Sequence, residues 1–527
     1  MKEVPFSMPL LMSILTLLPI VWLIIALAVL KMPGHRACLI ALLLTAVLAL
    51  TLWKMPPVDC LTSALEGFAG ALWPIILVII AAIFTYNLSL RTGAMDVIKR
   101  MLSNVSGDKR VIILLIGWCF GGFLEGMAGF GTAVAIPAGM LVGMGMDPVL
   151  SCLVCMLANA FPTAFGSVGI PTTTLVSVTG LDAIPLSFTT VVEMTPFMIL
   201  VPFLMVIAGG GGIKALKGVV GITFVAGLSF VIPELAVSYF LGPELTVVVG
   251  SVVSLVCTLA MARMRKSKAV PAEYQMTSGQ QKAQVGEKNT MSPLVAFLPF
   301  LLIFVLLLLT SKLVPPVNSF LAQFASSFKI STSASAGMTS FSWVNTPGVV
   351  IFVAAIIGGI VQKAGARLMW NTFLATLKQM SRTIVTIMAV LAVAKIMTYS
   401  GMISDMAGLF VSITGVFYPF VSPIIAAIGA FVTGSGTNTE VLLGRLQSEA
   451  ATAIGASPYW LAAANSVGAG IGKILSPQCI ATAVAAVGLV GQDSKVLAAV
   501  LKWAIFMLVL ACVLVGCFQW LAPYLIG

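Results

Sequence analysis

The chain has 527 residues, of which 60% are hydrophobic and only 9% are charged, with a formal net charge of +11. Because soluble globular proteins carry about 25% charged residues, this composition excludes an ordinary soluble domain. The basic residues stand in short loops between apolar runs, as in the cytoplasmic loops of membrane proteins. The positive charge therefore does not indicate a nucleic-acid partner.

The long apolar runs predict an all-α polytopic membrane protein. Residues 10–30 and 37–53 are each long enough to cross about 30 Å of hydrocarbon at about 1.5 Å per residue. The runs are continuous rather than alternating, which excludes a transmembrane barrel, and the first is expected to be a retained helix rather than a signal peptide. The predicted spans are 8–30, 37–54, 71–90, 111–146, 148–181, 194–209, 217–232, 244–262, 292–312, 347–363, 381–399, 422–454, 458–490 and 497–522.

Three basic loops predict the orientation of these spans. They follow the first, third and eighth spans, and the positive-inside rule places them in the cytoplasm, with both termini outside. In this arrangement 111–146 leaves and re-enters on the cytoplasmic side, as a re-entrant hairpin broken at about 125–132. Its partner, 422–454, enters from the outside, so the two halves are expected to be inverted copies.

The same reasoning divides the chain into four regions. The first is a group of N-terminal membrane helices, two are inverted repeats that each hold a hairpin and a broken span, and one connects the repeats through a cytoplasmic and an external loop. In chain order they are the N-terminal helices 1–70, the first repeat 71–262 with hairpin 111–146 and broken span 148–181, the connecting region 263–380 with loops 263–291 and 313–346, and the second repeat 381–527 with hairpin 422–454 and broken span 458–490.

Two interrupted segments, about 305 residues apart, share one pattern. Gly129–Thr132 matches Gly434–Thr437, and the Ala-Asn pair at 158–159 recurs at 464–465. The glycine and proline that follow recur at the same spacing, at 166 and 171 and then at 472 and 477. Tightly packed glycine-rich helices are one explanation. Paired interrupted segments are also typical of transporter binding sites, and the match over four elements favours this second interpretation.

A break in a membrane helix leaves backbone N–H groups without partners, and such breaks persist where they line a polar cavity. A helix that begins in mid-membrane also presents the positive end of its dipole, which suits a small anion. The neutral polar side chains at the tips and breaks can equally cap their own helices. The predicted substrate-binding residues are Gly129, Phe130, Gly131, Thr132, Asn159, Gly434, Ser435, Gly436, Thr437, Asn438, Asn465, Lys473 and Ser476.

Charged residues within these segments are functional candidates, because charge is costly at mid-membrane. Lys473, expected inside the break of span 458–490, is the best candidate to pair with a substrate carboxylate, with interface snorkelling or a structural ion pair as alternatives. Glu125 and Glu440 are the proton-coupling candidates; Glu125 can equally cap the broken helix, and Glu440 can pair with Arg445. Lys395 is read more simply as a snorkelling lysine.

The sequence predicts no catalytic residue, no metal site and no cofactor. Its one histidine is His35, in the first loop, and its nine cysteines are scattered through apolar runs. Cys152 and Cys155 share a helical face, yet no further histidine or cysteine stands near them. An intramembrane enzyme needs a nucleophile with a base, or a metal cluster, so an enzyme is disfavoured. A channel stays open as an alternative until saturable, accumulating uptake is measured.

Several motifs resemble the lactate permease family, which includes glycolate permeases, and the resemblance covers most of the chain. They are Leu-Trp-Pro-Ile at 72–75, Phe-Leu-Glu-Gly-Met-Ala-Gly-Phe-Gly at 123–131 and Gly-Lys-Ile-Leu-Ser-Pro-Gln at 472–478. The resemblance implies proton-coupled uptake of L-lactate, D-lactate and glycolate across the bacterial inner membrane. It also implies inverted repeats with paired hairpins and an elevator-like motion. The oligomeric state is left open, and a homodimer is compatible with the sequence.

Two positions depart from the family pattern. Ala133 stands where members often carry proline, and Gly436 stands where they often carry an acid. Proton coupling would then rest on Glu440 or Glu125, and a cation-coupled carrier of dicarboxylates or other organic anions is the alternative function. A membrane potential of about 100 mV, negative inside, opposes the entry of a monocarboxylate by roughly 2.3 kcal/mol. Entry together with one proton avoids this cost. A proton, or a sodium ion, is therefore expected as the partner of the carboxylate.

Overall fold

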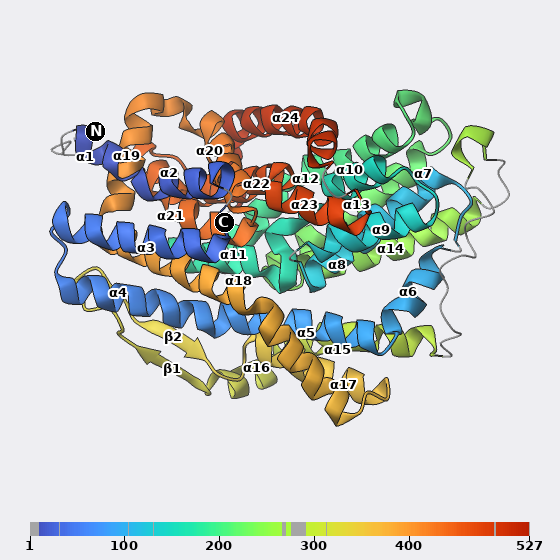
Figure 1. Ribbon diagram of the computed structural model, residues 1–527, viewed down its shortest axis with the longest axis horizontal. Helices are drawn as coiled ribbons and strands as arrows, with labels where there is room; N and C mark the ends of the chain where they lie inside the picture. The colour runs from blue at the N-terminus through green and yellow to red at the C-terminus, as the bar shows by residue number, and fades with distance from the viewer. Residues whose placement is uncertain are drawn as a thin grey trace.

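The computed structural model describes residues 10–30, 32–103, 105–129, 131–265, 270–275, 291–311, 313–489 and 492–525. Within these residues, ten helices are long and apolar enough to cross a membrane, or up to 12 if each bent pair counts as one span. Figure 1 shows most of these helices running lengthwise beside one another. The architecture agrees with the predicted polytopic helical fold. Phe130 and most of the predicted loop 263–291 lie outside the described residues.

The N-terminal quarter contains a helical run longer than expected. The span predicted at 71–90 begins at Pro57 and forms 35 residues of helix to Arg91, bent at the cis peptide before Pro74. The predicted boundary at residue 70 thus falls inside a continuous run. Within residues 57–70 the one buried acid, Glu66, pairs with Lys395 at 2.7 Å, which offsets the cost of burying its charge. The elements are α1 (Leu10–Leu15), α2 (Leu18–Ile24), η1 (Ile25–Val29), α3 (Gly34–Thr51), α4 (Pro57–Gly70), η2 (Ala71–Ile76), α5 (Leu77–Arg91) and α6 (Ala94–Ser103).

The first hairpin lies at the centre of the next group of helices. Its two arms are antiparallel neighbours, because a Cβ built on Gly121 would lie 3.5 Å from the Ala133 carbonyl oxygen and 3.8 Å from the Pro137 ring. The elements are α7 (Lys109–Ile112), η3 (Ile113–Phe120), α8 (Gly121–Met127), α9 (Thr132–Gly143), α10 (Pro148–Asn159), η4 (Pro162–Phe165), α11 (Gly166–Thr179), α12 (Ala183–Gly209), η5 (Ile213–Leu216), α13 (Val220–Phe240) and α14 (Thr246–Met264).

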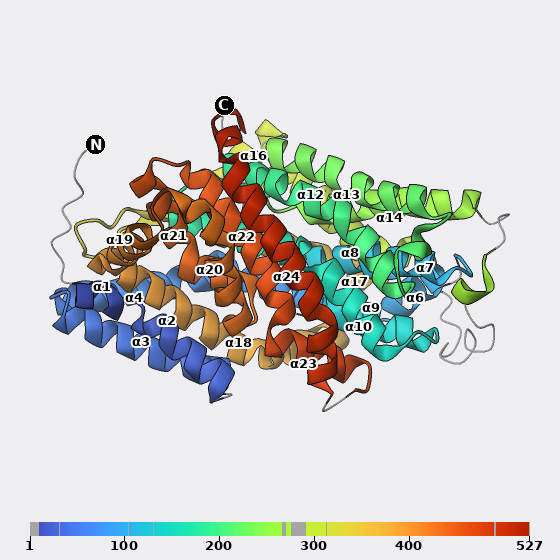
Figure 2. The same ribbon diagram turned by 90° about the horizontal axis from the view of Figure 1, so that it is seen from above.

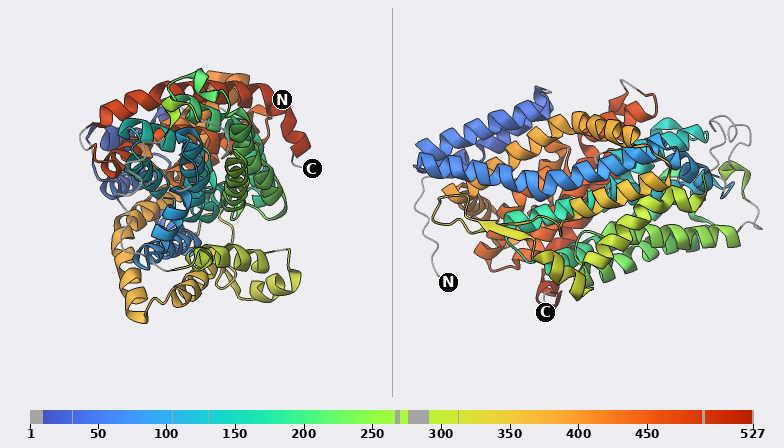
Figure 3. Two further views of the ribbon diagram at one scale, coloured as in Figure 1. Left: turned by 90° about the vertical axis from the view of Figure 1, so that its right-hand side faces the viewer. Right: turned by 90° about the horizontal axis from the view of Figure 1, so that it is seen from below.

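The connecting region contains a short antiparallel ribbon inside the predicted external loop. Ala325 pairs with Ser342 and Phe328 with Thr339. The Thr332 hydroxyl donates to the Asp59 carboxylate at 2.5 Å, which ties the ribbon to α4, and Figure 1 shows the ribbon beneath α4. The elements are η6 (Ala272–Tyr274), α15 (Pro293–Thr310), α16 (Pro315–Ala322), β1 (Ala325–Phe328), β2 (Thr339–Ser342) and α17 (Pro347–Val361). Figure 3 shows α15 and α17 at one edge of the bundle, where α17 packs against α5 and α15 packs against α17 and α6.

The second hairpin consists of α20 and α21. Its arms are also antiparallel neighbours, because a Cβ on Gly429 would meet the side chains of Leu443 and Thr439. Helix α24 (Asp493–Phe518) crosses the outside of this half, and Figure 2 shows it passing over α20 and α22. The elements are α18 (Ala366–Ser400), α19 (Met402–Thr414), η7 (Gly415–Phe417), α20 (Tyr418–Thr433), α21 (Gly436–Ile454), α22 (Pro458–Leu475), α23 (Pro477–Ala486), α24 (Asp493–Phe518), η8 (Gln519–Leu521) and α25 (Ala522–Leu525).

Both spans expected to be broken are bent. The first turns by 58° between α10 and the η4–α11 segment, and the second by 51° between α22 and α23. In the first, Ser167, Val168 and Gly169 all adopt left-handed backbone angles, so the helix unwinds there before it resumes. Each hairpin packs against such a bend, because α8 contacts η4 and α11 while α21 contacts α11 and α22. The bends and the hairpin tips therefore meet within the core.

Candidate functional site

Four buried polar side chains meet in the core and form what we call the Lys473 cluster: Glu125, Asn159, Thr163 and Lys473. The Glu125 carboxylate accepts hydrogen bonds from Asn159 Nδ2 at 2.8 Å and from Thr163 Oγ1 at 2.7 Å. Lys473 Nζ lies 3.0 Å from Glu125 Oε1 and also donates to the Thr163 hydroxyl. The cluster therefore joins the first hairpin to both bent spans.

Local backbone features bring these groups together. A Cβ on Gly166 would lie 2.7 Å from Glu125 Oε1, so glycine is what lets the carboxylate approach the unwound stretch. Lys473 stands in the last turn of α22, and the bend itself comes at Ser476. The expectation that Lys473 lies inside the break is thus wrong by about one turn, because α22 stays helical until Pro477 ends it. Its side chain is buried, which excludes snorkelling to the interface.

Glu125 acts as a counter-ion rather than as a helix cap. It lies within α8, and its partners among the described residues are the side chains of Asn159, Thr163 and Lys473. A capping carboxylate would instead accept from backbone amides of a first helical turn. The capping alternative is therefore not supported by this geometry, and the carboxylate balances the charge of the buried lysine.

One acceptor in the Lys473 cluster has no donor. Asn159 Oδ1 is buried and makes no hydrogen bond within the part of the chain that the structure describes. Most buried polar atoms in proteins are paired, because leaving one unpaired costs about 1–3 kcal/mol. The same amide donates through Nδ2 to Glu125, which fixes the direction of Oδ1. The cluster thus presents a buried cation and a free acceptor close together, as a ligand with an anion and a donor requires.

A second buried carboxylate, Glu440, lies on the other hairpin. It accepts from Asn465 Nδ2 at 2.7 Å, and Asn465 Oδ1 accepts in turn from Gln447 Nε2 at 3.4 Å. The expected Glu440–Arg445 pair does not form: Arg445 bridges Glu449 at 2.8 Å instead. Residues five apart on a helix point to different faces, whereas residues four apart are neighbours. Glu440 is therefore held by the neutral amide of Asn465 rather than by Arg445.

Both hairpin tips contact the same short helix, α23. A Cβ on Gly131 would lie 3.0 Å from Thr482 Cγ2, and a Cβ on Gly434 would lie 2.6 Å from Gln478 Oε1. Both tip glycines have positive φ angles, +86° and +65°, which glycine adopts without steric cost. Because Gln478 and Thr482 stand one helical turn apart, the two tips lie side by side along α23.

Three helices begin where these tips meet α23, namely α9, α21 and α23. Gly131 precedes α9 and gives it no side-chain cap. Ser435 caps α21 by accepting from the Asn438 amide at 3.3 Å, and Ser476 caps α23 by accepting from the Cys479 amide at 3.1 Å. Helix N-termini favour anions. The two serines predicted to bind substrate thus serve as caps in this arrangement, beside three positive helix ends.

The remaining predicted residues lie at the tips of the two hairpins. The Thr132 hydroxyl donates to the Gly129 carbonyl oxygen at 2.8 Å, so it supports its own turn. Thr437 and Asn438 are buried in the first turn of α21. A Cβ on Gly436 would lie 3.6 Å from Thr163 Cγ2, which places the second tip against the Lys473 cluster.

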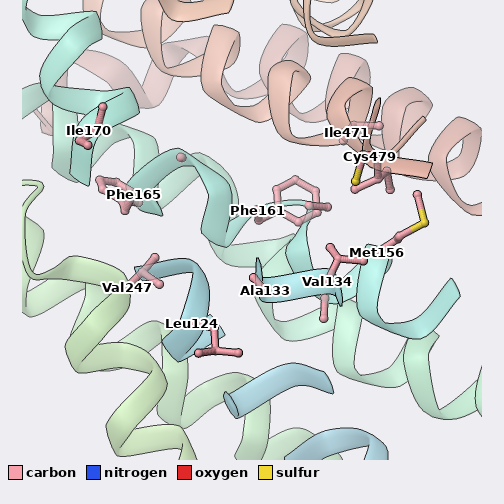
Figure 4. Packing of buried hydrophobic residues seen from close by; sticks show 14 of the residues in the cluster. Leu124, Ala133, Val134, Met156, Phe161, Phe165, Ile170, Val247, Ile471 and Cys479 are labelled. Atoms are coloured by element: carbon pink, nitrogen blue, oxygen red, sulfur yellow. The ribbon is translucent and has the colours of Figure 1, made fainter. Parts of the chain in front are cut away.

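Aromatic side chains pack on one side of the hairpin tips and the two bends. Phe161, in the first bend, stacks on Phe197 of α12 with ring centroids 4.6 Å apart. Figure 4 shows Phe161 between Ala133 and Val134 of α9 and the Ile471–Cys479 side of the second bent span. Within the described residues, no group of three or more His, Cys, Asp or Glu side chains gathers to hold a metal ion.

Comparison with known proteins identifies the group to which the chain belongs. The family model described as L-lactate permease matches residues 12–522. The chain belongs to the L-lactate permease family. Members of this family are transporters rather than enzymes, which confirms both the resemblance noted in the sequence and the expectation that the chain is not an enzyme. Family membership and the many apolar helices make it a multi-pass plasma-membrane protein.

Its relatives align over nearly their full lengths. An L-lactate permease of Streptococcus iniae is 40% identical over 86% of this chain and 93% of its own. An L-lactate permease of Escherichia coli strain K12 is 35% identical, and the glycolate permease GlcA of that strain is 33% identical, each over 92% of this chain and 91% of its own. The crystal structure of the Alcanivorax borkumensis YdaH transporter is similar in fold, with a TM-score of 0.51 at 14% identity, covering 93% of this chain and 99% of that one.

In this member of the permease family, the structure gathers some predicted residues and separates others. Glu125, Asn159 and Lys473 meet in one cluster, whereas Glu440 and Asn465 form another. The sequence analysis missed Thr163 and Gln478. A signal for each was present: Thr163 follows Asn159 by four residues, and Gln478 ends the Ser-Pro-Gln motif at the second bend.

Proposed function

We propose that the protein imports small 2-hydroxy monocarboxylates, namely L-lactate, D-lactate and glycolate, by proton symport. The observation that carries this proposal is the buried Lys473 ammonium close to the unpaired Asn159 Oδ1. A 2-hydroxy acid carries an anion and an O–H donor on adjacent carbons, which matches that pair of groups. The names of the relatives, L-lactate permease and glycolate permease, point to the same chemical class.

The donor count of Lys473 supports direct binding of the carboxylate. A lysine ammonium has three N–H donors, and the described partners of Lys473, Glu125 and Thr163, take two of them. The substrate carboxylate accepts the third, while the substrate hydroxyl donates to Asn159 Oδ1. The positive ends of α9 and α21 at the adjoining tips strengthen the attraction for an anion.

Coupling and motion complete the proposal. Import of one carboxylate with one proton moves no net charge, so the roughly 2.3 kcal/mol per 100 mV that opposes an anion does not apply. Glu125 and Glu440 are the candidate proton carriers. In this proposal the two hairpins enter from opposite faces of the membrane, and both termini lie outside. The regions 71–262 and 381–527 are inverted repeats. The unit that contains the two hairpins slides as in an elevator. Two antiparallel hairpins, each packed on a bent span, support this arrangement.

The alternative function is a cation-coupled carrier of dicarboxylates or other organic anions. The Lys473 cluster contains one cation, Lys473 itself, and one substrate carboxylate takes its remaining N–H donor. A second substrate carboxylate would find no further cation there, and burying an unpaired charge is costly. The cluster therefore favours a monocarboxylate.

Counterflow in proteoliposomes tests the substrate class. Vesicles loaded with unlabelled L-lactate should take up labelled L-lactate, and external D-lactate or glycolate should inhibit that uptake. The proposal is wrong if succinate competes better than L-lactate does. A channel would give downhill flux without counterflow, so the same measurement separates a carrier from a channel.

A further inference from the structure

We propose that Glu440 binds the symported proton, whereas Glu125 is the lasting counter-ion of Lys473. This division of roles rests on the proton symport proposed above. Sequence position alone leaves the two carboxylates equivalent as candidates. The structure distinguishes them by what surrounds each one.

The two carboxylates start from matched settings. Each stands about one helical turn from a tip glycine, Glu125 before Gly129 and Glu440 after Gly436. Each accepts a hydrogen bond from the asparagine of its own repeated Ala-Asn pair, from Asn159 at 2.8 Å and from Asn465 at 2.7 Å. Each is almost fully buried. The repeat thus supplies the asparagine of each pair, whereas the two carboxylates stand on opposite sides of the repeated tip.

A cation reaches only the first of these pairs. Lys473 lies 3.0 Å from Glu125, and it comes from the opposite half of the chain. The repeat-equivalent position of Lys473 is Ser167, a neutral residue whose hydroxyl donates to the Ala128 carbonyl oxygen at 2.8 Å. Among the described residues, Glu440 has no ion-pair partner. A buried carboxylate without a cation is strongly disfavoured in its ionised form, whereas one paired with lysine is not.

The buried and partly buried ionisable groups on the elements packed against α21 are engaged elsewhere, and Arg367, Lys378 and Arg382 of α18 are exposed. On α22, Lys473 pairs with Glu125, and on α18, Lys395 pairs with Glu66. Asp405 of α19 accepts from the Trp53 indole, and the Tyr418 hydroxyl of α20 donates to Gln447. Arg445, on α21 itself, bridges Glu449. The segments η4 and α11 contain no ionisable side chain. None of these groups supplies the charge that an ionised Glu440 needs.

The proton therefore goes to Glu440. It comes from external water, converts the carboxylate to a neutral acid while the residue is buried, and returns to water when the site opens to the cytoplasm. The acid is also linked to the proposed substrate site through α22, because its partner Asn465 is two helical turns before Lys473 on that helix. Proton binding at one end of this buried stretch and substrate binding at the other can therefore bias the same helix.

The test compares Glu440→Gln with Glu449→Gln, a control on the same helix that removes an acid already paired with Arg445. Proteoliposomes are assayed for L-lactate counterflow at equal pH, for accumulation under an inward proton gradient, and for alkalinisation of the medium when lactate is added. Glu440→Gln should keep counterflow but lose at least about tenfold in accumulation, together with the alkalinisation. The control should behave like the wild type. Proton-driven accumulation by Glu440→Gln at the wild-type level would overturn the assignment.

Two further variants keep the proposal testable if Glu440→Gln does not fold. Glu440→Asp retains the acid in a new position and should shift the pH profile of accumulation; an unchanged profile would count against the assignment. Glu125→Gln should raise the apparent KM and keep the pH dependence, so loss of pH dependence in this variant would assign the proton to Glu125. Absence of lactate counterflow in the wild type would instead refute the proposed function itself.

Discussion

Lys473 Nζ lies 3.0 Å from Glu125 Oε1, although 348 positions separate the two residues in the chain. The pair is buried on both sides, with side-chain exposures of 9% and 3%. It therefore ties the end of α22 to the first hairpin at a point where polar groups from both bent spans converge. Removing one member of a buried ion pair is far more costly than removing both, so substitutions here link function to stability.

Lys473→Met should raise the apparent KM for L-lactate by about 10- to 150-fold, and it should also lower stability because the buried Glu125 loses its partner. The rise in KM is expected because a hydrogen bond to a charged partner contributes about 1.5–3 kcal/mol, and each 1.4 kcal/mol is a factor of ten. Initial rates of uptake across a range of lactate concentrations provide the measurement. Lys502→Met, at an exposed lysine of α24, is the control and should leave KM unchanged.

Glu125→Gln should destabilise the protein by about 3–5 kcal/mol, because the buried Lys473 loses its counter-ion. The double variant Glu125→Gln/Lys473→Met should recover part of that loss. Thermal unfolding in detergent of the wild type, the two single variants and the double variant forms a double-mutant cycle, which measures the interaction energy of the two side chains. Additive effects of the two substitutions would show that the two side chains do not interact.

Asn159→Ala should weaken the preference for hydroxy acids. If the substrate hydroxyl donates to Asn159 Oδ1, then propionate and pyruvate, which lack that donor, should compete about 5- to 150-fold less well than L-lactate in the wild type. In Asn159→Ala the gap should shrink. Asn465→Ala is the matched control at the repeat-equivalent position and should keep it. Competition against labelled L-lactate measures this preference in the wild type and in both variants.

Two glycines of the site should differ in their tolerance of alanine. A Cβ on Gly472 would clash with the Ala427 carbonyl oxygen, which is backbone and cannot move aside easily. A Cβ on Gly436 would lie 3.6 Å from Thr163 Cγ2, an ordinary contact. Gly472→Ala should therefore destabilise by about 1–3 kcal/mol or more, while Gly436→Ala should fold like the wild type. Unfolding temperatures and yields of the two variants check this difference.

Features that depend on local pattern could be predicted from the sequence. Glycine and proline within apolar runs indicated both bent spans, and the lone lysine in such a run indicated Lys473 as a site residue. The Glu125–Lys473 contact could not be predicted, because its members belong to different halves and only the tertiary arrangement joins them. The expected Glu440–Arg445 pair failed for a related reason, since Glu449 offers a better helical spacing.

The predicted spans 37–54 and 71–90 left Glu66 between them. It is buried in α4, where Lys395 and Tyr399 both donate to it. The same contact accounts for Lys395, which is bound to an acid rather than extended to the interface. A buried charge can thus be read correctly only when its partner is known, and here the partner is 329 positions away.

Uptake driven by a pH jump in proteoliposomes tests the central claim most directly. An inward proton gradient should drive accumulation of L-lactate, D-lactate and glycolate above equilibrium, with weaker uptake of propionate, pyruvate and succinate. Lys473→Met should lose this accumulation at low substrate concentration. The account is contradicted if the proton gradient has no effect on lactate uptake, or if succinate accumulates more strongly than lactate.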